Sequence, residues 1–236
     1  MKAAISKEHR DFYYKNGWIQ FEEVFSTAQV TQLSQSINQT IASRLKMEPN
    51  QLDHALFEKI YLQSRDLWRD CKWIKQFISS PRLSQILFEL TGIKPFRLGF
   101  DLILQEINPK FLSQSSYYEK LLQSQISFQN ISSLKGLIAA FIICLQDQET
   151  KEEQLIDSKT LFPIKAGDVA VVNSETIIDF STLFGHCSKR FYVVSYANFS
   201  SYYLYEPNDP HLHHLKKFGY SFNEKLNDRL HPIIYR

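Results

Sequence analysis

Three histidines in the C-terminal part of the chain come closest to a metal-binding pattern. His211, His213 and His214 cluster with Glu206 and Asp209 nearby. Imidazole and carboxylate groups are ligands for divalent ions, and side chains at positions i and i+2 leave the same face of a strand. A divalent ion could therefore bind to His211 and His213. A polar surface loop after Asn208-Asp209-Pro210 is the simpler interpretation of the same residues.

Other chemical motifs are missing from the sequence. No G-x-G-x-x-G or Walker-type segment occurs among only seven glycines, which argues against a glycine-rich phosphate loop. Cys71, Cys144 and Cys187 are widely spaced and form no C-x-x-C pair, so neither a zinc finger nor a disulfide framework is indicated. No serine or cysteine nucleophile has a recognisable motif around it. The cysteine pattern and an N-terminus without an apolar signal segment favour a reducing, cytoplasmic location.

The composition is that of an ordinary soluble globular protein. Hydrophobic residues make up 44% and charged residues 22% of the chain. Its 236 residues are enough for one large domain or at most two small ones. A net charge of +2 without a basic block makes nucleic acid an unlikely partner, although scattered lysines and arginines could still form a basic face. The longest apolar run, residues 136–145, is too short to cross a membrane.

Periodicity predicts helices first and strands second. Ser26 and Gln29 form a capping box before a helix with a buried apolar stripe, and Ser80-Pro81 opens a helix that ends at Gly92. After Pro95 the residues become typical of strands, and β-branched and aromatic residues dominate from about residue 126. We therefore expect one α+β domain over residues 1–236, helix-rich over 1–92 and built of strands over 93–236.

The order of these pieces resembles a known family. The segments DFYYKNGWI (11–19), WIKQFISSPRLSQILFELTG (73–92) and AGDVAVV (166–172) are similar to the phytanoyl-CoA dioxygenase-like branch of the non-haem Fe(II)/2-oxoglutarate-dependent oxygenase superfamily. The similarity covers roughly residues 8–200 and rests on patterns. It implies a double-stranded β-helix, a jelly-roll or cupin-like barrel, with an N-terminal helical layer. It also implies Fe(II) and 2-oxoglutarate as cofactors.

The metal ligands that this resemblance implies are missing at the corresponding positions. The family pattern is His-x-Asp followed by a distal His, which leaves three metal positions open for O₂ and 2-oxoglutarate. The matching positions in this chain are Phe128, Asn130 and Asp179, or neighbours within a residue or two. The one His-x-Asp in the chain, residues 9–11, lies in a predicted N-terminal helix. We therefore expect a degenerate iron site, and we assign no catalytic residue.

One basic position of the family pattern survives. Arg190, which follows Lys189 at the start of an apolar strand, matches the residue that holds the far carboxylate of 2-oxoglutarate, although a surface cation beside a strand is the simpler interpretation. His186 lies four residues earlier and could reach the metal position only if the loop were unusually short. Otherwise it belongs to the barrel rim.

Three functional hypotheses follow. The first is an oxygenase-type barrel without conventional Fe(II)/2-oxoglutarate dioxygenase activity, which binds a small acidic molecule with Arg190 as its anchor or acts through its surfaces. The second is an oxygenase or other metalloenzyme with displaced ligands. The third is a metal- or metabolite-responsive regulator, including one of transcription. The first is preferred because all three ligand positions are changed and phenylalanine cannot bind a metal.

Overall fold

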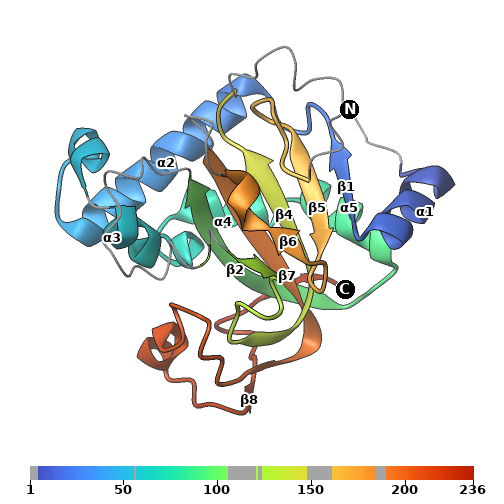
Figure 1. Ribbon diagram of the computed structural model, residues 1–236. Coiled ribbons are helices and arrows are strands. Elements are labelled where there is room, and N and C mark those ends of the chain that lie inside the picture. Colours follow the sequence, from blue (N-terminus) through green and yellow to red (C-terminus); the bar gives the residue numbers. More distant parts are fainter. Residues whose placement is uncertain (1–4, 56, 106–120, 122–123, 148–160, 184–189) are drawn as a thin grey trace.

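The computed structural model describes residues 5–55, 57–105, 121, 124–147, 161–183 and 190–236. Five α-helices come first in this part of the chain, with one short strand among them (Figure 1). They are α1 (Lys7–Asn16), α2 (Thr27–Leu45), α3 (Phe57–Gln63), α4 (Lys72–Ile78) and α5 (Pro81–Thr91). None of the described helices has the length and apolar character needed to span a membrane.

The sequence signals at the helix ends are confirmed. The Ser26 hydroxyl accepts the Gln29 amide while the Gln29 side chain accepts the Ser26 amide, so α2 begins with a capping box. Pro81 occupies the first turn of α5, and Gly92 ends that helix in the left-handed region at φ 67°. The predicted stripe of α2 is buried at Val30, Leu33, Ile37 and Ile41.

A strongly curled antiparallel sheet forms the body of the protein. Its strands are ordered β1-β5-β4-β7-β2-β9, and β8 pairs with β7. They are β1 (Trp18–Phe21), β2 (Phe96–Gln105), β4 (Leu134–Cys144), β5 (Val169–Asn173), β7 (Arg190–Tyr203), β8 (Glu224–Lys225) and β9 (Ile233–Tyr235). A separate ribbon pairs β3 (Gln125–Ile126) with β6 (Ile178–Asp179). This half-barrel with helices is compatible with a cupin-like fold (Figure 1).

The two faces of the sheet have different neighbours. Side chains alternate between faces along a strand. On β7, the Tyr196 hydroxyl donates to the Ile78 carbonyl of α4 at 2.5 Å, so its face is covered by helices. The Phe191 ring instead contacts Phe162 at 5.2 Å between centroids, on the opposite face. That opposite face is the concave interior where a barrel enzyme would have its site.

Candidate functional site

Two phenylalanines meet where the metal ligands were expected. The ribbon pairs Ile126 with Ile178, and Phe128 and Phe180 follow two residues after each. Their rings pack edge to face, 6.0 Å apart at an angle of 86°, and both side chains are fully buried. The ribbon therefore directs two apolar rings into the interior from symmetrical positions.

A phenylalanine cluster continues from this pair to the main sheet. Phe162 lies 6.4 Å from Phe180 and 5.2 Å from Phe191 of β7. We refer to Phe128, Phe162, Phe180 and Phe191 as the phenylalanine cluster. Iron in this class of site needs nitrogen and oxygen ligands with open positions beside them. The side chains of the cluster offer carbon atoms only, so the residues that the structure describes at this position do not fit Fe(II).

The other two degenerate positions lie apart from the cluster. Asn130 is exposed and its amide closes a turn on the Ser127 carbonyl at 3.0 Å. The Asp179 carboxylate accepts from the Ser181 amide at 2.9 Å and from the exposed Gln125 side chain at 3.1 Å. The bonds from Ser181 lower the pKa of Asp179. Asp179 thus caps the 3₁₀ helix over Phe180–Leu183, and the first residue of that helix, Phe180, fills the interior.

Arg190 is held by the helical layer. Its guanidinium donates to the Asn38 side chain of α2 at 2.6 Å. The next residue, Phe191, joins the phenylalanine cluster, and consecutive side chains leave opposite faces of a strand. The Asn38 partner of Arg190 therefore lies on the face of the sheet that the helices cover, and not in the interior. The role of Arg190 as an anchor for an acidic ligand stays a prediction. Lys189 and His186 lie outside the described residues.

The histidines near the C-terminus do not lie on a strand. The expectation that His211 and His213 leave the same face of a strand is therefore wrong. Turns cover residues 207, 208 and 210–213, and a 3₁₀ helix follows over His214–Phe218. His211 is buried and its Nε2 donates to the Tyr61 carbonyl at 3.2 Å, while His213 is exposed. Within the described part of the chain, no group of three or more His, Cys, Asp or Glu side chains is placed to hold a metal ion.

His211 has a structural role in a buried tie between segments. The Asp209 carboxylate accepts from both the amide and the hydroxyl of Ser133 at 2.7 Å, and its other oxygen accepts the His211 amide at 2.8 Å. Burial, aided by Arg65, lowers the pKa of His211 to about 4, so the ring is neutral at pH 7. The tie holds the turn over residues 207–211 against α3 and the start of β4.

A buried charged network, invisible in the sequence, lies beside this tie. Asp66, in the left-handed region at φ 56°, pairs with Arg69 at 2.9 Å and lies 3.5 Å from His214. Burial alone would raise the pKa of Asp66, but Arg69, His214 and Arg65 hold it well below its usual range. The Arg65 guanidinium covers the Phe100 ring of β2 at 3.5 Å.

Asp101 of β2 connects this network to the sheet. Its carboxylate accepts the amides of Leu67 and Trp68 at 2.8 and 3.1 Å. Burial and the nearby Asp66 charge raise the pKa of Asp101 to about 7. A carboxyl group with such a pKa could serve as an acid or base. Asp101 has no exposed surface, however, and we interpret it as a structural acceptor.

His231 allows a pH-dependent test of this network. Its Nδ1 donates to the Leu98 carbonyl at 3.0 Å and its Nε2 accepts from Arg69 at 3.1 Å. Burial, together with Arg69, lowers its pKa from 6.5 to about 4. A base with a lowered pKa contributes stability that is complete above pH 6.5 and is lost as the pH falls toward 4.

We therefore expect His231→Gln to reduce the loss of unfolding free energy between pH 8 and pH 5 by about 2 kcal/mol. Asp101 titrates in the opposite direction in both proteins, so the difference between them isolates His231. Urea unfolding at both pH values gives the measurement, and His213→Gln at an exposed position is the control. Equal pH dependence in His231→Gln and wild type would contradict the assignment.

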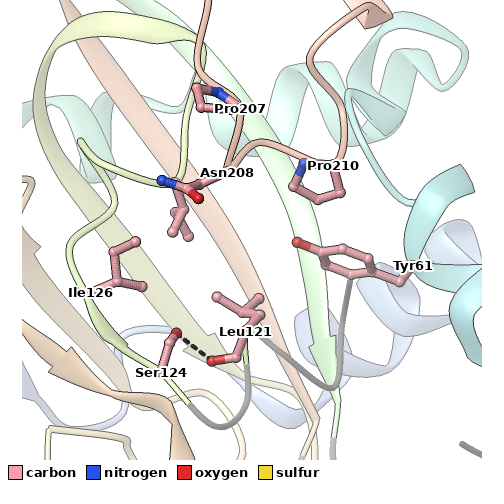
Figure 2. A pocket seen from close by; sticks show the side chains of 8 residues that line it. Tyr61, Leu121, Ser124, Ile126, Pro207, Asn208 and Pro210 are labelled. Atoms are coloured by element: carbon pink, nitrogen blue, oxygen red, sulfur yellow. Dashed lines mark hydrogen bonds between the residues drawn. The ribbon is translucent and has the colours of Figure 1, made fainter. Parts of the chain in front are cut away.

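A cavity opens between α3, the surroundings of β3 and the turn after β7. Its volume is about 340 Å³, at the small end of the range for ligand pockets. Figure 2 shows the Tyr61 hydroxyl pointing into it, with Asn208 and Pro210 on one side and Leu121 on the other. This cavity is the candidate binding site, which the sequence did not indicate because its walls come from three distant segments.

Comparisons with known proteins show the class of fold. No family model and no curated protein sequence matches the chain. Among solved structures, the carbocyclase SnoK, a non-heme α-ketoglutarate-dependent enzyme from nogalamycin biosynthesis, superimposes with a TM-score of 0.63 at 15% identity over 98% of this chain and 96% of its own. The epimerase SnoN, dependent on the same cofactors, gives 0.63 at 14% identity over 96% and 97%.

The chain therefore shares the fold of non-heme iron, α-ketoglutarate-dependent enzymes, as the sequence resemblance predicted. SnoN has also been solved in complex with Fe³⁺, α-ketoglutarate and a nogalamycin compound, and that structure superimposes with a TM-score of 0.61. The described residues of this chain show no metal-binding group. At such low identity the likeness establishes the fold alone.

Proposed function

We propose that this protein is a double-stranded β-helix of the Fe(II)/2-oxoglutarate oxygenase type that acts without iron at the barrel centre. It then functions by binding a small molecule and not as a conventional dioxygenase. The observation that carries the proposal is the buried contact between Phe128 and Phe180. Relationship to the phytanoyl-CoA dioxygenase-like branch and a cytoplasmic location are part of the same proposal.

Coordination chemistry supports this reading. Non-heme iron of this type is held by two histidines and a carboxylate, which leave open positions for O₂ and the cosubstrate. Replacing one ligand leaves a site that water or an anion could complete. Filling the centre with packed rings removes both the donor atoms and the space. Arg190, the position expected to grip 2-oxoglutarate, contacts Asn38 of the helical layer.

Anaerobic calorimetric titration with Fe(II), with and without 2-oxoglutarate, tests the proposal. We expect no one-to-one binding tighter than about 100 μM for either compound, because the described residues of the interior offer no set of ligands to either. SnoK, measured under the same conditions, serves as the positive control for this fold. Micromolar one-to-one iron binding that 2-oxoglutarate strengthens would overturn the proposal and favour an oxygenase with displaced ligands. Iron binding indifferent to 2-oxoglutarate would also overturn it, in favour of a metal-responsive regulator.

A further inference from the structure

One wall of the cavity in Figure 2 is held in place by buried hydrogen bonds. The turn that carries Pro207, Asn208 and Pro210 is tied to the start of β4 by the two 2.7 Å bonds between Asp209 and Ser133. It is tied to α3 by the His211 bond to the Tyr61 carbonyl. All four partners of these ties are buried. A wall held in this way loses little conformational entropy when a ligand binds, which favours binding of a specific ligand.

Five of the eight described residues that line the cavity are apolar. The apolar side chains are Leu121, Ile126, Ile131, Pro207 and Pro210. Among the described residues that line the cavity, none carries a charge. Arg65 and Asp209, which lie close by, already interact with each other and with buried neighbours behind the wall. Because a buried charge without a partner is costly, the cavity favours an uncharged molecule.

The polar groups in the lining are mainly acceptors. The Ser124 hydroxyl donates to the Leu121 carbonyl at 2.6 Å, which leaves lone pairs on its oxygen. The Asn208 amide nitrogen donates to Glu206 at 3.1 Å, which leaves the Asn208 carbonyl oxygen to accept. The Tyr61 hydroxyl, which points into the cavity in Figure 2, can donate or accept. A ligand that matches this arrangement supplies an O–H or N–H group.

We infer that this cavity binds an uncharged, mainly apolar ring compound that carries at least one hydrogen-bond donor. The apolar side chains enclose its rings, and Asn208 and Ser124 accept from its donor. The described lining of this cavity includes none of the positions where iron ligands were expected, so an experiment separate from the iron titration tests the binding of such a ligand. The volume of about 340 Å³ suits a compact compound of up to three rings and not a long chain.

Two fluorescent probes with one skeleton test the charge and donor requirements. N-phenyl-1-naphthylamine is uncharged and has one N–H, and 8-anilinonaphthalene-1-sulfonate is the same molecule with a sulfonate. We expect the uncharged probe to bind one to one, at least about tenfold more tightly than the sulfonate. The N-methylated form of the uncharged probe, which lacks the donor, should bind about fivefold more weakly than its parent.

Three variants locate the binding. Ile131→Phe adds bulk inside the cavity and should weaken N-phenyl-1-naphthylamine at least about tenfold. Ile177→Phe makes the same change at a position that is 60% exposed and should leave the affinity unchanged. Because Ile131→Phe could disturb folding, the exposed Asn208→Ala provides a milder test. It should weaken the parent probe about fivefold and leave the N-methylated probe unaffected.

Each opposite result overturns the inference. Equal or tighter binding of the sulfonate would show a charged or nonspecific surface. An unchanged affinity in both Ile131→Phe and Asn208→Ala would place the probe elsewhere. The iron titration and the probe titration can fail separately. A protein that binds no iron can still fail to bind the probe, and a protein that binds iron can still bind the probe in this cavity.

Discussion

Replacing Phe128 by alanine is expected to lower the free energy of unfolding by about 3–5 kcal/mol. The side chain is fully buried, packs edge to face on Phe180 and belongs to a cluster that reaches Phe191 of the main sheet. Removing the ring forfeits its burial and leaves a cavity whose walls come from both the ribbon and the sheet. Urea unfolding followed by tryptophan fluorescence gives the measurement.

Phe199→Ala is the matched control. That ring is 49% exposed, so its loss should cost no more than about 1 kcal/mol, including its contact with Arg97. A cost below about 1 kcal/mol for Phe128→Ala would show that the cluster is not a packed core. A second variant, Phe128→His, restores one ligand type. We expect it to gain no iron affinity, because Phe162 and Phe180 still occupy the interior.

The starts and ends of the helices could be predicted because their capping motifs involve residues that are close in sequence. A capping box joins Ser26 to Gln29, and a left-handed glycine closes α5 at residue 92. The strand-like character after Pro95 likewise predicted β2 and the sheet beyond it. Such patterns depend on a few consecutive residues, so the α+β layout followed from the sequence.

Which side chains face inward at the candidate iron site was harder to predict from the sequence. The sequence pointed to Asp179, but β6 contains only two residues, too few to reveal which side chains face inward. The structure buries Phe180, whereas the Asp179 carboxylate at the end of β6 accepts the Ser181 amide. Arg190 was found as a position, but the direction of its side chain depends on the alternation along β7 and on Asn38.

The buried polar residues could not be predicted because their partners lie far apart in sequence. Asp101 accepts amides 33 and 34 residues earlier, and His231 reaches Leu98 across 133 residues. Taken singly, each looks like a solvent-exposed polar residue. Together they join the helical layer, the sheet and the C-terminal segment. The candidate cavity depends on the same long-range joints, since its turn is held through Asp209 and His211.

Removal of the Asp66 carboxylate should be the most damaging change in this network. Asp66 is 1% exposed and neutralises Arg69, which in turn donates to the Leu230 carbonyl at 2.7 Å and to His231. Asp66→Ala leaves the largely buried Arg69 guanidinium without its counter-ion, at a cost of about 3–5 kcal/mol. Alanine also tolerates the φ of 56° less well than aspartate does.

Two comparisons separate the causes of that loss. Asp66→Asn keeps a residue suited to the left-handed region and removes only the charge, so it should still cost at least about 2 kcal/mol. Asp70→Ala breaks the pair with Arg44, but the Asp70 side chain is 54% exposed and the cost should stay below about 1 kcal/mol. Urea unfolding measures all three variants.

Amide hydrogen exchange should show which segments are destabilised in Asp66→Ala. Because Arg69 links Asp66 to Leu230 and His231, amides near the C-terminus should exchange faster in Asp66→Ala than those of the sheet interior. Equal acceleration at every amide would mean global destabilisation alone. If Asp66→Asn proved as stable as wild type, the carboxylate charge would not be what holds the C-terminal segment to the helical layer.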